Sequence, residues 1–520
     1  MSLLKSVTTF GSWTLVSRIT GFFRDMVLAN FLGAGLVSDA FFVAFKLPNL
    51  FRSLFAEGAF TSAFVPMLSQ KLEKQDKETA MEFAGRAICV LTFFVAILVI
   101  VMQIFMPVVV KVMAPGFASD IDKVELAVTL SRITFPFLLF ISIVSFQSGI
   151  LNSLGRFMAP ASAPVILNLI MISSVFVFVP FFPQGPAYGI AFSVSVAGLL
   201  EIIYLHFFLK KENASINLSF KVFDSLKDAE IKTLFKRIGP GVLGSGIYQI
   251  NVLIGTILAS LVGAGAISWL YYASRLQQLP LGVVGAAISV AILPVLSAHL
   301  KGNRKKEAKE IQDKAIMYGA FLSIPSMIAL MVLARPIINI LFEHGQFGVL
   351  DTDNTSGALI ALALGLPSYV FTKALAPNFF ARGDTKTPVK YSVVLLIANL
   401  LLTIVLMGPM GHVGIALASS IASFVSLYQY LRGLKKRGFW SMSKALKKTI
   451  LKVSIASIFM GAVLMAVQMV LGDWLAYSLN IRLIILMFLC IVGLISFITF
   501  AKVLKILDVV AFIKGLKNAK

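Results

Sequence analysis

The stretch VSRITGFFRDMVLA, residues 16–29, places three charged residues inside an apolar run that extends from Phe10 to Leu32. They are Arg18, Arg24 and Asp25. A charge at the centre of a membrane span costs on the order of 3 kcal/mol, so each needs a partner or a polar cavity. A guanidinium group can bind phosphate oxygens through two parallel hydrogen bonds, which an ammonium group cannot do. Arg18 and Arg24 therefore predict a binding site for an anionic, phosphate-like group at membrane depth.

More charged residues lie at membrane depth in other apolar runs. They are Lys46, Arg52, Arg132, Arg275 and Lys373, with Asp39 and Glu57 as acidic companions. Asp39 and Lys46 are seven residues apart, as are Arg18 and Asp25, so each pair shares a helix face. Arg24 and Asp25 are adjacent, and we expect Asp25 to orient a group on a neighbouring helix instead of pairing with Arg24. Arg52, Arg132 and Lys373 could alternatively extend along the helix to the membrane interface.

Membrane-spanning helices must position these residues. The 520-residue chain is 58% hydrophobic and only 13% charged, whereas soluble domains carry about 25% charged residues. Runs such as AICVLTFFVAILVIVMQIFMPVVV are long enough to cross a bilayer as helices. Long continuous runs also favour helices over a barrel of short alternating strands. The sequence predicts an all-α integral membrane protein with about fourteen transmembrane helices.

The basic residues give this protein its expected orientation. The formal net charge is +22, but the lysines and arginines gather in alternate loops, as in proteins inserted with their positive loops inside. Both termini are therefore predicted to be cytoplasmic, and nucleic acid is not an expected partner. Cys89 and Cys490 lie in separate spans, and the four histidines lack metal-binding spacing. We expect no metal, cofactor or catalytic nucleophile.

An internal repeat sets the predicted domain organisation. LANFLGAGLVSDAFFVAFKLP from Leu28 resembles LASLVGAGAISWLYYASRLQQ from Leu258, at an offset close to 230 residues. The offset covers six helices, so the two copies are parallel in the membrane, as in transporters that bind substrate between repeats. The predicted parts are an N-lobe (1–212), a cytoplasmic linker (213–235), a C-lobe (236–435) and two further spans with a tail (436–520). The lysine-rich linker and tail predict contact with anionic lipids, although ordinary orientation bias explains them equally well.

Five sequence words carry a resemblance to a known family. They are SRITGFFRDMVLANFLGAG, DAFFVAFKLPNLFRSLFAEGAFTSAFVP, YYASRLQQLPLGV, LFEHGQFGVLDT and FFARGDTKTPVK. With the expected span count, they resemble the MurJ (MviN) family of lipid II flippases. That family belongs to a superfamily that includes multidrug exporters and polysaccharide flippases.

The resemblance implies a function in peptidoglycan synthesis and cell-wall biogenesis. The protein would be a transporter in the bacterial inner membrane that moves undecaprenyl-pyrophosphate-linked disaccharide pentapeptide to the outer leaflet by alternating access. Other proteins of cell-wall synthesis are expected partners. Spans 13 and 14 would form a groove for the polyprenyl tail, and their removal is expected to spare both lobes. The substrate-binding residues implied by the resemblance are Arg18, Arg24, Arg52, Arg275 and Asp39, with Ser17, Asp25, Lys46 and Glu57 beside them.

Two departures from the family limit what the resemblance implies. Many relatives have an aspartate before the arginine of span 8, where this chain has Ser274. Spans 7 and 11 contain no carboxylate, so a sodium site does not carry over, and coupling to an ion or to the membrane potential is left open.

Three other functions compete with this interpretation. A polysaccharide flippase also moves a polyprenyl pyrophosphate. A multidrug cation antiporter should present carboxylates, whereas bases outnumber acids here. A membrane enzyme would need a catalytic cluster, which Asp39 and Glu57 support poorly.

Overall fold

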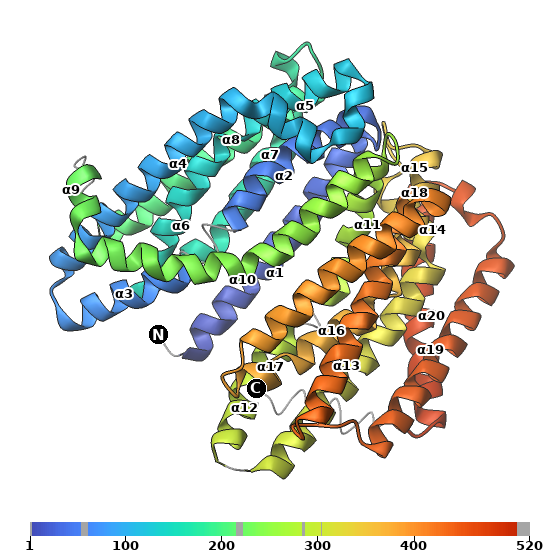
Figure 1. Ribbon diagram of the computed structural model, residues 1–520. Coiled ribbons are helices and arrows are strands. Elements are labelled where there is room, and N and C mark those ends of the chain that lie inside the picture. The colour runs from blue at the N-terminus through green and yellow to red at the C-terminus, as the bar shows by residue number, and fades with distance from the viewer. Residues whose placement is uncertain (1–2, 54–60, 215–221, 283–285, 303, 507–520) are drawn as a thin grey trace. The chain divides into compact units, whose positions relative to one another are not determined.

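The computed structural model describes residues 3–53, 61–214, 222–282, 286–302 and 304–506, and the regular secondary structure of these residues is entirely helical (Figure 1). Nine stretches of the described residues are long and apolar enough to cross a membrane. These findings confirm the predicted all-α membrane fold, while the count of fourteen spans stays a prediction.

The first compact unit comprises Met1–Ser268 and Gly345–Phe347. Within it α8 packs against α6 and α7, α1 packs against α7, and α2 packs against α5. Phenylalanine rings fill part of its core, with those of Phe64 and Phe146 centred 4.7 Å apart and tilted by 60°. Its helices are α1 (Leu3–Leu32), α2 (Leu36–Phe51), α3 (Thr61–Lys74), α4 (Lys77–Met113), α5 (Ile121–Thr134), α6 (Phe137–Ser153), α7 (Met158–Val177), α8 (Pro186–Lys211), α9 (Val222–Lys227) and α10 (Ala229–Ser260), with short 3₁₀ helices at Pro115–Ser119 and Val179–Phe181.

The second compact unit comprises Trp269–His344 and Gly348–Lys520. Its core joins α16 and α19 through α13, which packs against both. Its helices are α11 (Ala266–Pro280, which begins in the first unit), α12 (Ala286–Lys301), α13 (Lys305–Val332), α14 (Ala334–Phe342), α15 (Val349–Ala363), α16 (Leu366–Leu375), α17 (Pro377–Phe380), α18 (Lys386–Lys436), α19 (Lys444–Leu471) and α20 (Leu479–Val503), with a 3₁₀ helix at Trp474–Ala476. The boundary between the two compact units falls at Ser268, not at the lobe boundaries that the sequence repeat predicts. The lobe boundaries therefore stay a prediction.

Glycines make the turns that the repeat requires. Gly33 ends α1 with φ +64°, and its repeat counterpart Gly263 follows α10 with φ +145°. A side chain is strained at such positive φ values, which explains the repeated glycine. Gly411 has a non-helical φ of +57° within α18. The 51 residues of α18 are therefore two helices that meet at a kink.

The short segment Gly345–Phe347 belongs to the first unit although its neighbours belong to the second. Gln346 N–H donates to the Asn30 carbonyl at 2.9 Å, at the end of α1. A Cβ at Gly345 would lie 2.3 Å from the same carbonyl oxygen. The word LFEHGQFGVLDT thus has a packing role at this position.

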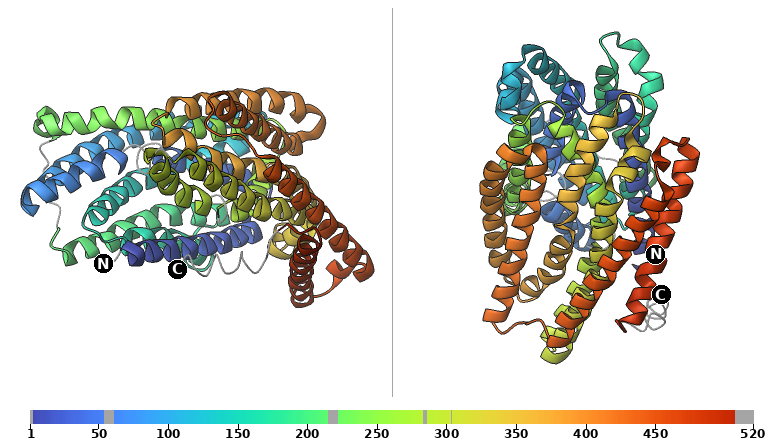
Figure 2. Two further views of the ribbon diagram at one scale, coloured as in Figure 1. Left: turned by 90° about the horizontal axis from the view of Figure 1, so that it is seen from below. Right: turned by 90° about the vertical axis from the view of Figure 1, so that its right-hand side faces the viewer.

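The hairpin of α19 and α20 is an integral part of the second unit. The two helices lie side by side (Figure 2) and pack against one another. Val453, Ala456 and Met460 of α19 and Phe497 of α20 are buried in one apolar cluster with residues of α13 and α16. Removing residues after Lys444 would expose this core, which argues against the expectation that removal spares both lobes; that expectation stays a prediction.

Candidate functional site

The charged residues of α1 differ in their surroundings. Arg24 is only 7% exposed and Asp25 only 1%, whereas Arg18 is exposed and makes no side-chain hydrogen bond or ion pair with the residues that the structure describes. The Arg24 Nη2 lies 2.7 Å from Asp25 Oδ1, and its Nε donates to the same oxygen at 3.1 Å. The expectation that these neighbours cannot pair is wrong, because the long arginine side chain curls back to the shorter aspartate.

A second helix fixes the orientation of the Arg24 guanidinium. Its Nη1 donates to Asn168 Oδ1 of α7 at 3.0 Å. The Asn168 Nδ2 in turn donates to the Ser17 carbonyl at 3.0 Å and to Thr20 Oγ1 at 3.1 Å. The ring of Phe45 lies beneath the guanidinium carbon at 5.6 Å. Arg24 is therefore held by α1, α2 and α7, in the manner of a preorganised donor.

Asp39 has a different environment, at the start of α2. It is fully buried, and it accepts hydrogen bonds from Gly265 N–H at 2.7 Å and from Ser268 N–H at 3.0 Å. The Lys123 ammonium lies 3.2 Å from its Oδ2. The Ser268 N–H is a first-turn group of α11, and such groups need an acceptor outside the helix. The geometry gives Asp39 a positioning role at the start of α11, while direct contact with substrate stays a prediction.

The remaining basic candidates of the first unit lie on α2 and directly after its end. The Lys46 ammonium donates to Thr256 Oγ1 of α10, so Lys46 and Asp39 both turn toward residues that follow the linker, as their shared face predicts. Arg52 is half-buried and interacts electrostatically with Glu201 of α8. Glu57 lies outside the described residues.

Arg275 lies on α11, in the second unit. Its Nη2 donates to the Tyr271 hydroxyl at 2.8 Å, and its guanidinium stacks over the Tyr271 ring at 4.7 Å. Ser274 Oγ donates to the Tyr271 carbonyl at 2.7 Å. Position 274 has a serine where many relatives have an aspartate. Tyr271, one turn earlier on α11, is a partner of Arg275 instead.

Three further residues were missed from the sequence. Asn168 and Glu201 both interrupt apolar runs, and Glu201 is 1% exposed on α8. A carboxyl group within a span signals function in its own right, so Glu201 could have been found. Lys123 lies 84 residues from Asp39 in the sequence, and only the three-dimensional structure brings the two together.

Comparisons with known proteins agree with the architecture. A sequence model of the family described as lipid II flippase MurJ matches residues 28–485. A probable lipid II flippase MurJ of Rhizobium tropici is 40% identical over 461 residues, covering 88% of this chain and 86% of the relative.

Solved structures agree as well. One described as lipid II flippase MurJ in an inward closed conformation is 28% identical, has a TM-score of 0.78, and covers 95% of this chain and 98% of its own. An inward-facing multidrug resistance MATE family transporter of the MOP superfamily is 17% identical, with a TM-score of 0.69 and coverages of 83% and 96%; it shares the fold. With a matching family model over most of its length and relatives of this similarity, the chain belongs to the lipid II flippase MurJ family.

Proposed function

We propose that this multi-pass membrane protein carries lipid II from the cytoplasmic to the outer leaflet of the bacterial inner membrane by alternating access. The pyrophosphate would bind in a cationic central cavity to which Arg18, Arg24, Arg52 and Arg275 contribute. Membership of a transporter family supports the activity. Both termini would be cytoplasmic, as the distribution of basic loops indicates.

The observation that carries the proposal is the buried guanidinium of Arg24. Its hydrogen bonds to Asp25 and Asn168 fix the plane of the guanidinium group, and both partners of the group are polar. A pyrophosphate oxygen of the substrate can replace the Asn168 oxygen as the acceptor for Arg24, because hydrogen bonds to an ionised oxygen are roughly twice as strong as those to a neutral one. An arginine held in this way discriminates an anion from a cationic drug.

The experiment compares lipid binding and transport in matched variants. We expect the purified protein to retain lipid II over phosphatidylglycerol in native mass spectrometry, and Arg24→Ala to lose this preference. Arg24→Ala should also fail to support growth of a depleted strain, and Arg24→Lys should be impaired, since an ammonium lacks the planar fork.

Arg335 provides the matched control. It forms an ion pair with Asp353 at 2.9 Å, but both side chains are more than half exposed. Arg335→Ala should retain lipid II and support growth. Equal retention of lipid II and phosphatidylglycerol by the unmodified protein would overturn the proposal, as would growth supported by Arg24→Ala. Preference for a lipid-linked oligosaccharide without the pentapeptide would instead favour a polysaccharide flippase.

The driving force is a further part of the proposal. We infer that transport is coupled to the membrane potential or to an ion, since moving one charge through the field is worth about 2.3 kcal/mol per 100 mV. Initial transport rates in vesicles with and without an imposed potential test this. Equal rates would exclude the potential as the driver.

A further inference from the structure

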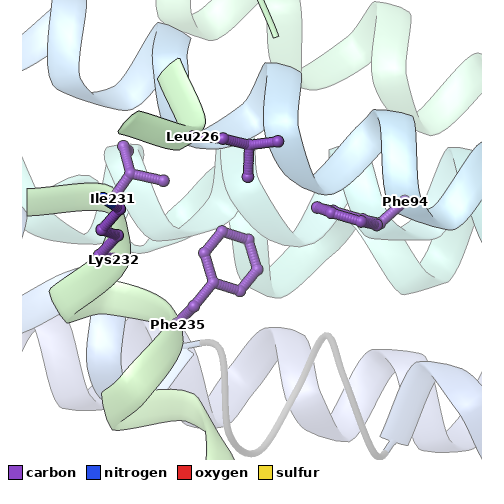
Figure 3. Close-up of a pocket in the computed structure, with 5 residues that line it drawn as sticks. All are labelled: Phe94, Leu226, Ile231, Lys232 and Phe235. Atoms are coloured by element: carbon purple, nitrogen blue, oxygen red, sulfur yellow. The ribbon is translucent and has the colours of Figure 1, made fainter. Parts of the chain in front are cut away.

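A pocket lies where the chain leaves the linker and enters α10. Its volume is about 310 Å³, and its lining residues come from α4, α9 and α10 (Figure 3). Four of the five lining residues are apolar, and the fifth is Lys232. The apolar residues are Phe94, Leu226, Ile231 and Phe235. Figure 3 shows the Phe94 and Phe235 rings on different helices, with Leu226 above them and Lys232 beside Ile231. An apolar pocket with one cationic group is suited to an amphipathic, anionic ligand.

The sequence of α4 places this pocket near a membrane surface. The polar first part of α4 ends at Arg86, and an apolar run begins at Ala87. Phe94 lies eight residues beyond Arg86, about 12 Å along the helix axis. The neighbouring rings of Phe93 and Phe223 are centred 6.0 Å apart, and Phe223 is 71% exposed. Exposed phenylalanines beside lysines are typical of helices that lie at the boundary between lipid headgroups and acyl chains.

The ion pairs around the pocket leave its lysines available. Asp228 pairs with Arg86 at 3.3 Å, and Glu230 pairs with Lys71 at 2.6 Å. Two acids that could neutralise the linker lysines are thus already paired with bases of α3 and α4.

Three lysines remain near the pocket. Lys227, Lys232 and Lys236 are exposed, and their ammonium groups make no ion pair with any described residue. Lys232 and Lys236 lie one turn apart on the same face of α10. Among the described residues of α9 and the first two turns of α10, Asp224 is the acid that remains without an ion pair, so the three lysines leave the rim of the pocket with a net positive charge.

We propose that this pocket binds an acyl chain of an anionic phospholipid, with the lipid phosphate held by Lys232 and Lys236. The apolar lining takes the chain, and the exposed lysines take the headgroup charge. The bound lipid would fasten the linker and the start of α10 to α4 at the membrane surface. This site is separate from Arg24 and its partners, and it does not depend on lipid II transport.

Native mass spectrometry of the full chain tests the lipid preference. The protein, free of lipid II, is offered phosphatidylglycerol and phosphatidylcholine with identical acyl chains, and we expect phosphatidylglycerol to be retained. Lys232→Gln should reduce the preference about fivefold, the equivalent of about 1 kcal/mol for one lysine at a lipid surface. Lys309→Gln, an exposed lysine at the start of α13, is the matched control and should leave the preference unchanged.

A second measurement locates the bound chain. A phosphatidylglycerol with a photoreactive acyl chain should label peptides that contain Phe94 or Phe235, and Leu226→Trp should abolish this labelling by filling the pocket. Thermal unfolding of each variant in detergent verifies folding. Equal retention of the two lipids by the unmodified protein would overturn the proposal. Labelling that survives Leu226→Trp in folded protein would also overturn it.

Discussion

The surroundings of Arg24 explain how a charge is tolerated in a membrane span. Asp25 balances it from the next position on the same helix, and the Asn168 amide orients it from another helix. The sequence identified Arg24, because a charged residue inside an apolar run has to be satisfied. It could not identify Asn168 as the partner, since 144 residues separate the two. It also missed the pairing with Asp25, because helix periodicity describes faces and not how far a long side chain can bend.

Replacement of Asn168 tests this positioning role. We expect Asn168→Ala to reduce transport at least tenfold, because the guanidinium loses its fixed plane and α1 loses two hydrogen bonds to α7; tenfold corresponds to about 1.4 kcal/mol. Lipid II transport in vesicles measures the effect. Ser173→Ala, which removes only a local hydroxyl on the same helix, should transport normally. An Asn168→Ala protein with normal transport would show that Arg24 does not need its amide partner.

Glu201 provides a second test at this scale. Its Oε2 has no hydrogen-bond partner among the described residues, and Arg52 is its charged neighbour. A buried carboxyl group must either bind a proton or be balanced by a cation. If the substrate phosphate draws Arg52 away, Glu201 should take up a proton. We therefore expect Glu201→Gln to flatten the pH dependence of transport in vesicles; an unchanged pH profile would contradict this role.

At the scale of elements, two of the sequence segments that resemble the family make contacts that stabilise turns. The segment Gly345–Phe347 reaches the end of α1, and the word FFARGDTKTPVK covers the turn before α18 and the first residues of that helix. In that turn Asp384 accepts from Thr387 N–H at 2.9 Å and pairs with Arg437. The sequence indicated that these words matter without indicating how. Their partners, Asn30 and Arg437, are distant in sequence, so no local pattern reveals them.

Gly345→Ala should destabilise the contact with α1. The residue has φ +58°, and the new Cβ would meet Asn30 at 2.3 Å. The left-handed conformation alone costs about 1–2 kcal/mol for a residue with a side chain. We expect a lower midpoint of thermal unfolding in detergent. Gly348→Ala is the matched control, because nothing lies within 4 Å of its Cβ position; an equal loss in both variants would contradict the explanation.

Asp384 should make stability depend on pH. Hydrogen bonds from Thr387, followed by the bond from Arg437, lower the pKa of Asp384 to about 2. Its contribution is therefore complete above the unfolded pKa of about 3.9 and is lost as the pH falls through about 2. Asp384→Asn should lower the unfolding midpoint at pH 7 and should differ less from the unmodified protein near pH 2. Asp122→Asn, which removes one carboxylate at an exposed position, is the matched control.

The whole molecule shows where sequence reasoning about the fold succeeds. Apolar runs predicted the helices and the membrane, because both follow from local composition. The sequence repeat did not reveal that α19 and α20 contribute to the core of the second unit, since the repeat has no counterpart for them. Burial of one helix against another depends on contacts between distant residues such as Gly461 and Ile328, which periodicity alone does not specify.

Gly461 tests the integration of the hairpin. A Cβ there would lie 2.6 Å from Ile328 Cγ2 of α13. We expect Gly461→Val to separate the two helices and to lower the free energy of unfolding by about 1–3 kcal/mol, the usual cost of overpacking. Unfolding in detergent measures this. Met469→Leu, at a position that is 81% exposed on α19, should have no effect; an unaltered Gly461→Val protein would argue that the hairpin packs loosely.

The length of α4 has a consequence for hydrophobic matching. Of its 37 residues, those from Ala87 to Val110 form an apolar run of 24, about 36 Å long at 1.5 Å per residue. A bilayer core of about 30 Å is shorter than this run, so α4 must tilt or thicken the lipid around it. Each ångström of mismatch costs a fraction of a kcal/mol. The acyl-chain length of the surrounding bilayer therefore contributes to the conformational energy of the first unit, and it does so without a specific lipid contact.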